Sequence, residues 1–146
     1  MISKEFLTAG CAIFTVSSPT GEYYTYQVKA VDLDIAGSVP QTRYFVRLLT
    51  GPDNENDYTY LGELLPGTGW VQMTRASKLP PESKPVAVVR WACRHICCPN
   101  PENPFPADRG YKIEHCGYCG RCGRTLTTPE SIERGLGPVC AAEVAF

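Results

Sequence analysis

The chain has 146 residues, a formal net charge of -1 at pH 7 and an ordinary hydrophobic share of 43%. This length suits one compact domain, or a main domain with a small metal-held appendage. The nearly balanced charge excludes a strong overall field as the means of attracting nucleic acid, a membrane or an acidic substrate.

The first half of the chain predicts an antiparallel sheet, because short β-branched and aromatic runs alternate with turn clusters. Cys11–Ser17 and residues 22–31 flank a turn at residues 18–21 that contains both proline and glycine. Tyr24 and Tyr26 then lie on one face of the second strand, since strand side chains alternate. These residues form the first expected hairpin.

Three more strands are expected before residue 80. Residues 43–50 and Tyr58–Leu65 flank the polar loop 51–57, which we expect to protrude because it cannot bury itself. A turn at residues 66–69 leads to a fifth strand at residues 70–75. Five strands present a hydrophobic face that needs a cover.

The segment 83–97 predicts the helix that covers this face. Its apolar residues recur at spacings of three, four and three, at Val86, Val89, Cys93 and Ile96. Ser83 fits the N-cap, with Pro85 in the first turn. A buried strand at residues 86–93 is the alternative, because the same valines are β-prone, but the length of the stripe favours the helix.

A proline-rich segment follows the helix and marks the best domain boundary. Residues 99–110 contain four prolines among polar residues, which is typical of a linker or surface loop. We therefore expect a sheet-and-helix domain at residues 1–98, the linker at 99–110, and a small module at 111–146.

The last segment contains a zinc-knuckle pattern. Two residues separate Cys119 from Cys122, and glycines lie beside them, so both thiolates can reach one ion. Cys140 supplies a third ligand, at the start of a terminal helix whose free amides favour the thiolate. The fourth ligand comes from the adjacent pair His115 and Cys116, and spacing alone leans towards Cys116.

The expected cellular compartment supports metal rather than disulfides. Lys4 and Glu5 interrupt any signal-peptide core, and no apolar run is long enough to span a bilayer. We therefore expect a cytoplasmic protein with no membrane partner. In a reducing compartment, the eight cysteines of the chain favour zinc as the cofactor.

Residues 115–142, HCGYCGRCGRTLTTPESIERGLGPVCAA, resemble an uncharacterised zinc-ribbon-like domain family common in bacteriophages and plasmids. The words FLTAG, LTGPDN and DYTYLG nearer the N-terminus are also similar to proteins of this group. The resemblance implies zinc ligands at His115, Cys119, Cys122 and Cys140, and it implies no known activity. We accordingly favour His115 over Cys116. The expected fold class is α+β, an antiparallel sheet covered by one helix and followed by a zinc-ribbon or treble-clef-like module.

A second cluster of potential ligands lies at the end of the expected helix, at Cys93, His95, Cys97 and Cys98. These residues could hold another metal or place a cysteine beside a histidine as a nucleophile. The favoured interpretation is structural: Cys93 falls on the apolar stripe and packs in the core, and His95, next to Arg94, is exposed to solvent.

Two surfaces are candidates for binding. Arg121 and Arg124 project from the knuckle near tyrosines and could contact nucleic acid. Tyr58 and Tyr60 of the tyrosine-rich sheet could anchor a protein interface. A site with three or more cysteines is typically closed, which argues against catalysis.

We therefore expect a non-enzymatic zinc-binding protein of a phage or other mobile element. Its expected partner is a host protein, with inhibition of host defence as one such role. The alternative function is a DNA- or RNA-binding accessory factor. The sequence leaves the oligomeric state open.

Overall fold

A computed structural model of the chain describes residues 2–34, 37, 39, 41–52 and 57–116. Over these residues the chain forms one six-stranded antiparallel sheet in the order β5-β4-β3-β2-β1-β6. The strands are β1 (Cys11–Ser17), β2 (Tyr23–Leu33), β3 (Gln41–Leu49), β4 (Tyr58–Leu65), β5 (Trp70–Gln72) and β6 (Lys112–His115). The helices are α1 (Lys4–Leu7), α2 (Lys84–Cys97) and the 3-10 turn η1 (Ala107–Arg109).

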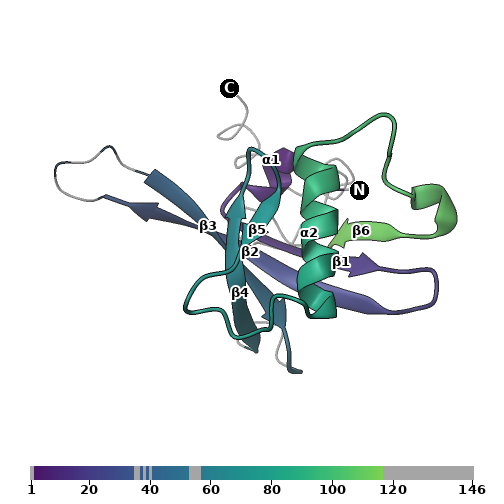
Figure 1. The fold of residues 1–146 in the computed structure, drawn as a ribbon, viewed down its shortest axis with the longest axis horizontal. Helices are drawn as coiled ribbons and strands as arrows, with labels where there is room; N and C mark the ends of the chain where they lie inside the picture. The colour runs from purple at the N-terminus through teal and green to yellow at the C-terminus, as the bar shows by residue number, and fades with distance from the viewer. Residues whose placement is uncertain (1, 35–36, 38, 40, 53–56, 117–146) are drawn as a thin grey trace.

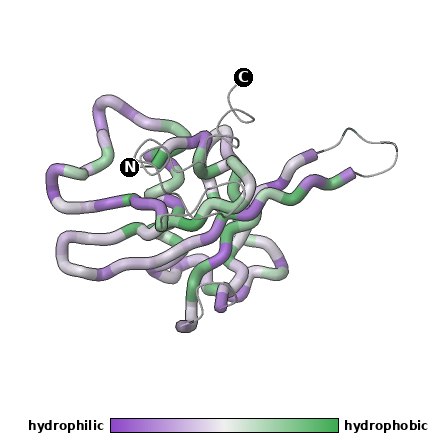
Figure 2. Tube along the Cα trace, turned by 180° about the vertical axis from the view of Figure 1, so that it is seen from behind, coloured by the Kyte–Doolittle hydropathy of each residue, from purple (hydrophilic) through white to green (hydrophobic). Residues whose placement is uncertain are grey.

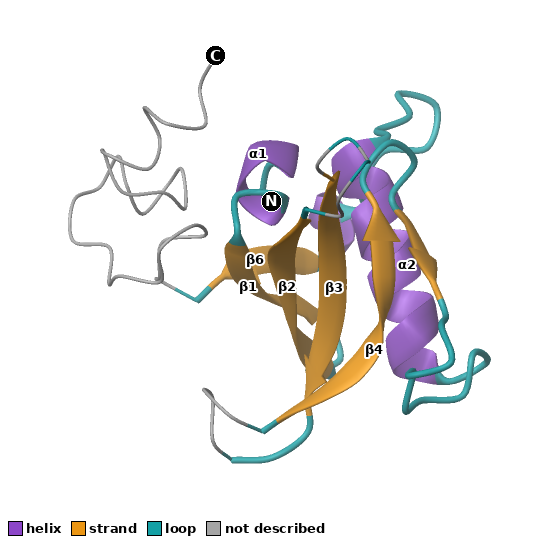
Figure 3. Cartoon of the chain, turned by 90° about the vertical axis from the view of Figure 1, so that its left-hand side faces the viewer, coloured by secondary structure: helices purple, strands orange, loops and turns teal. Residues whose placement is uncertain are grey.

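Helix α2 lies across one face of the curved sheet (Figure 1 and Figure 3). The four residues of its predicted apolar stripe are all buried, as is the neighbouring Ala92. The expected sheet covered by one helix is thus confirmed for the described residues, and the strand alternative at residues 86–93 is excluded. The predicted zinc-ribbon or treble-clef-like module lies mostly outside them.

The core lies between α2 and the sheet and follows the alternation of the strands. In β1 the residues that face the helix, Ala12, Phe14 and Val16, are buried, while their neighbours are half-exposed. Tyr26 of β2 is fully buried, and its hydroxyl donates a hydrogen bond to the Pro85 carbonyl oxygen at 2.7 Å. Each large apolar side chain buried here stabilises the fold by about 1.5–3 kcal/mol.

The helix begins at the predicted position but is capped differently. Ser83 is the N-cap residue, yet its hydroxyl donates to the Pro80 carbonyl oxygen at 2.7 Å and accepts nothing from the first turn. Pro85 occupies that first turn, where its missing amide costs no helical hydrogen bond.

Helix α1 is a short element that the sequence analysis did not predict. The side chain of Ser3 accepts a hydrogen bond from the Phe6 amide at 3.1 Å and so caps its start. Phe6 and Leu7 are fully buried. Through these two side chains the four-residue helix packs against the core next to β1.

Strands β2 and β3 form an arm that extends beyond the part of the sheet that α2 covers (Figure 1). Hydrophilic and hydrophobic residues alternate along the outer part of the arm (Figure 2), where the Thr42 hydroxyl donates to the Asp32 carboxylate at 2.8 Å. Of the loop 51–57, predicted to protrude, residues 53–56 lie outside the described part. The amide of Thr50 donates to the Asp57 carbonyl oxygen at 2.8 Å at its base.

Strand β6 follows the proline-rich segment and was also not predicted. It pairs with β1, with Phe14 opposite His115 and Ser17 opposite Lys112. The chain thus rejoins the sheet just before residue 117, where the described part ends. The division into units at 1–98, 99–110 and 111–146 stays a prediction. No helix among the described residues is long and apolar enough to cross a membrane.

The β4–β5 hairpin packs tightly on α2 through Gly69. This glycine has a φ of +80°, and a Cβ atom added to it would lie 2.4 Å from the Cys93 carbonyl oxygen. The predicted turn at residues 66–69 is thus confirmed, and its last residue must be glycine for both reasons.

We predict that Gly69→Ala lowers the free energy of unfolding by roughly 2 kcal/mol or more, because it adds both backbone strain and a backbone clash. Gly67→Ala is the matched control in the same turn, since a Cβ atom there would meet nothing within 4 Å. The control should stay within about 0.5 kcal/mol of the parent. Urea denaturation of both variants is the measurement, and equal losses would contradict the packing described.

Candidate functional site

His115 and Cys116 stand where β6 ends and the predicted zinc segment begins. His115 pairs with Phe14, which faces α2, and its ring lies 5.7 Å from the Phe6 ring. The Cys116 sulfur lies 3.7 Å from the hydroxyl of Thr15, which faces the opposite side of the sheet. Successive residues of an extended chain point to opposite faces, so one ion beside the sheet can take His115 or Cys116 but not both.

The remaining predicted ligands, Cys119, Cys122 and Cys140, lie outside the described residues, as do Arg121 and Arg124. Within residues 2–116 as far as they are described, no three His, Cys, Asp or Glu side chains are grouped to hold a metal ion. The structure therefore gives the surroundings of both candidates for the fourth ligand, and the zinc site itself stays a prediction.

The predicted interface residues Tyr58 and Tyr60 are both half-buried on β4. The Tyr60 hydroxyl accepts a hydrogen bond from the Thr74 hydroxyl at 3.1 Å. The Tyr58 hydroxyl is buried without a hydrogen-bond partner among the described residues. Burial raises the pKa of Tyr58, and the nearby Cys116 and Cys11 thiols raise it further. Tyr58 therefore lies near Cys116. Because both tyrosines are half-buried, only part of each ring is accessible to a binding partner.

An ion pair beside these tyrosines stiffens the same face of the sheet. Arg43 makes a bidentate contact with Glu63, and its Nε donates to Oε2 at 2.8 Å. The Arg43 hydrogen bond lowers the pKa of Glu63 below its usual value, although only 7% of the residue is exposed. The guanidinium also lies 5.5 Å from the centre of the Phe45 ring.

The second cysteine cluster does not converge on one point. Cys93 is fully buried in the core, as predicted, and burial raises the pKa of its thiol. Cys97 is half-buried and Cys98 is exposed. The spread of these thiols gives no support to a second metal site or to an activated nucleophile.

The expectation that His95 is exposed to solvent is wrong. Only 5% of the residue is exposed, and its ring lies 5.3 Å from Trp91 and 5.7 Å from Phe105. Burial, and to a lesser extent Arg94, lowers the pKa of His95, so the imidazole is neutral at pH 7. The residue belongs to an aromatic cluster that fixes the proline-rich segment against α2.

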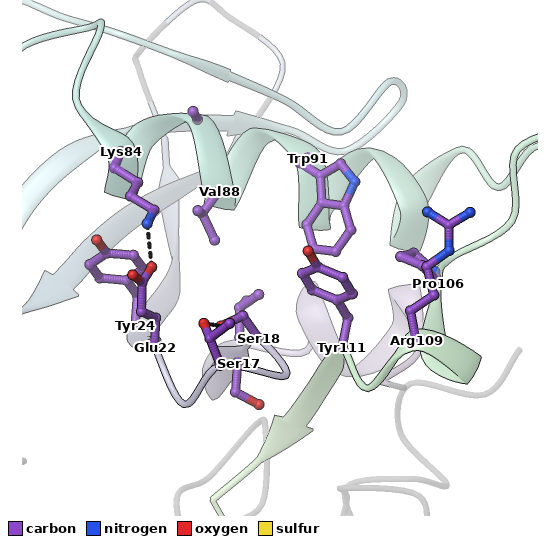
Figure 4. A pocket seen from close by; sticks show the side chains of 13 residues that line it. Ser17, Ser18, Glu22, Tyr24, Lys84, Val88, Trp91, Pro106, Arg109 and Tyr111 are labelled. Carbon is purple, nitrogen blue, oxygen red and sulfur yellow. Dashed lines mark hydrogen bonds and ion pairs between the residues drawn. The ribbon is translucent and has the colours of Figure 1, made fainter.

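A groove of about 590 Å³ lies between α2, the β1–β2 hairpin and the segment around η1 (Figure 4). Rings from three separate segments line it: Tyr24 of β2, Trp91 of α2 and Tyr111 just before β6. The groove could not be predicted from the sequence, because these segments are far apart in the chain. One feature of the sequence points to it: Trp91 lies outside the apolar stripe of its helix, which indicates that its ring contacts something other than the sheet.

Comparison with known proteins adds one finding. Residues 113–145 match a protein family described as a family of unknown function (DUF6011). No curated protein and no solved structure matches the chain. The matched stretch begins inside β6 and contains all four predicted zinc ligands.

Proposed function

We propose that the chain is a zinc-binding protein whose metal is structural, with His115, Cys119, Cys122 and Cys140 as ligands. The observation that carries this proposal is the pairing of β6 with β1, which fixes His115 at the edge of a rigid sheet. The knuckle spacing that follows is the pattern of a closed tetrahedral site. The matched family stretch, which begins inside β6 at residue 113 and includes the knuckle, supports one structural unit.

The biological role that we propose is binding without turnover, in a protein of phage or mobile-element origin that docks on a host protein in the cytoplasm. Inhibition of host defence is one form that this role can take. The support for this origin is the resemblance of residues 115–142 to phage and plasmid proteins. Exposed aromatic side chains support protein docking: Trp70 is 50% exposed and Tyr23 is 68% exposed.

A DNA or RNA accessory role is the second candidate, and one observation favours it. The Arg90 guanidinium lies 4.0 Å above the centre of the half-exposed Trp70 ring, with Arg94 exposed one turn further along α2. The helix carries no acidic residue. An aromatic ring beside cations is suited to stacking a base and contacting phosphates.

We predict that one zinc ion copurifies with each chain when chelators are omitted, as measured by elemental analysis. Cys119→Ser, Cys122→Ser and Cys140→Ser should each abolish stoichiometric zinc, because a structural site needs all its ligands. Cys93→Ser is the control and should keep its zinc, since Cys93 is buried in the core. Zinc-free protein from such a preparation would refute the site.

The zinc content of two further variants assigns the fourth ligand. His115→Ala should weaken zinc binding more than Cys116→Ala does. Because His115 also packs on Phe6, a Phe6→Leu variant controls for the lost ring contact while keeping the imidazole. If Cys116→Ala loses as much zinc as His115→Ala, or more, the thiol is the ligand and the metal lies on the Thr15 face of the sheet.

We predict that the two binding roles separate by salt. Binding to generic single-stranded DNA should be weak, and log K should fall with log salt by about 0.7 for each phosphate contacted. A host protein captured from nuclease-treated lysate should instead be retained at moderate salt, because the centre of such an interface is apolar.

Three variants identify the surface responsible. Arg94→Ala tests the α2 face, the double variant Arg121→Ala, Arg124→Ala tests the knuckle, and Arg47→Ala is an exposed control on the other face of the sheet. Tight DNA binding at physiological salt that either test variant abolishes, while Arg47→Ala does not, would replace the protein-docking role with the nucleic-acid role.

A further inference from the structure

The groove shown in Figure 4 has walls from three elements that are held together by packing. At one end an ion pair between Lys84 of α2 and Glu22 of the β1–β2 hairpin joins two walls. At the other, Gly110 approaches the hairpin so closely that an added Cβ atom would lie 2.9 Å from Cβ of Pro19. The groove is therefore built into the fold and does not depend on a single mobile loop.

Its aromatic wall is preorganised. The Trp91 ring lies 5.5 Å from the Tyr111 ring and 5.3 Å from the rings of both Phe105 and His95. Contacts with three rings hold the indole in place and leave one side of it on the groove. Rings fixed before binding lose little conformational entropy when a flat ligand packs on them.

The floor and the rim differ in polarity. Val16, Ala87 and Val88 supply apolar lining, and Ser18 and Thr20, whose hydroxyls are hydrogen-bonded to each other at 2.8 Å, lie beside it. The Glu22 carboxylate raises the pKa of Lys84, and Tyr24 and Tyr111 raise it to a smaller extent. Polar groups at the edge of an apolar slot are typical of sites for small molecules, and 590 Å³ lies within their usual range of about 300–1,000 Å³.

The charged residues that line the groove favour a negatively charged ligand. They are Lys84, Glu22 and Arg109, so cations exceed anions by one. Glu22 is occupied by Lys84, whereas the exposed Arg109 makes no ion pair with any described residue. A guanidinium at the end of an aromatic slot is suited to a phosphate or carboxylate.

We propose that this groove is a binding site for a small anionic molecule with a flat aromatic ring, such as a nucleoside monophosphate or an aromatic carboxylate. The ring packs against Trp91 and Tyr111 over Val88, and the anionic group contacts Arg109. This site is independent of the zinc site and of either macromolecular partner.

The test uses the 146-residue chain as purified without chelators and reads the indole N–H resonances of its two tryptophans by NMR. The probes are adenosine 5′-monophosphate and indole-3-acetate, with adenosine and indole-3-acetamide as uncharged counterparts. We expect one or both anionic probes to bind with a Kd below about 1 mM and to shift Trp91. Trp70, assigned with Trp70→Phe, should not shift.

Two variants locate the binding. Arg109→Ala should weaken the anionic probes about tenfold and leave the uncharged ones unchanged. Ala87→Trp fills the groove from an exposed helix position and should abolish binding, while Arg75→Ala is a distant exposed control without effect.

The preferred probe identifies the class of ligand, nucleotide or aromatic acid. The proposal is overturned if neither anionic probe binds with a Kd below about 1 mM. It is also overturned if the uncharged counterparts bind equally well, or if binding of the anionic probes is unchanged in Arg109→Ala.

Discussion

Four residues of β6 pair with four of β1, Lys112 to His115 against Ser17 to Phe14, and several features of the molecule depend on this pairing. β6 would otherwise be a short strand of mostly polar residues with little reason to fold alone. Pairing satisfies its backbone groups on one side and buries Ile113, which is 1% exposed. The sheet thereby extends to the point where the knuckle sequence begins.

The same pairing determines what lies on either side of β6. Before the strand, Tyr111 is brought beside Trp91, 5.5 Å from ring to ring, and the proline-rich segment is fixed by Phe105 and His95. At the end of the strand, His115 and the following Cys116 are directed to opposite faces. One short stretch of backbone hydrogen bonds thus positions the aromatic groove and restricts the proposed metal to one of two sides of the sheet.

Local patterns were enough to predict the parts of the fold with strong periodicity. The bounds of β1 and β4 and the apolar stripe of α2 could be predicted because alternation and helical spacing leave few other ways to bury those residues. β5 is shorter than the predicted strand at residues 70–75. It ends at Gln72, where its pairing with β4 also ends. β6 could not be predicted from Lys-Ile-Glu-His, because only its partner β1 makes those residues a strand.

Only part of the candidate site could be predicted from local sequence. The knuckle spacing predicts zinc ligands from local sequence, since two thiolates at this spacing can both reach one ion. His95 shows the limit: next to Arg94 its sequence context is polar, yet rings from residues 91 and 105 bury it. Tyr58 and Tyr60, expected to anchor a partner, are both half-buried, and the Tyr60 hydroxyl accepts a hydrogen bond from Thr74; their role as anchors stays a prediction. Tertiary contacts of this kind leave no local pattern.

Amide hydrogen exchange of the 146-residue chain, before and after treatment with a chelator, tests most directly whether a zinc site is coupled to the sheet through β6. Removing the metal with a chelator should lower the protection of the β6 amides that bond to β1 about tenfold or more, because the ligand segment no longer holds the strand in place. The Val28 amide at the centre of the sheet should keep its protection. Equal protection of β6 with and without metal, in protein shown to have lost its zinc, would contradict the account.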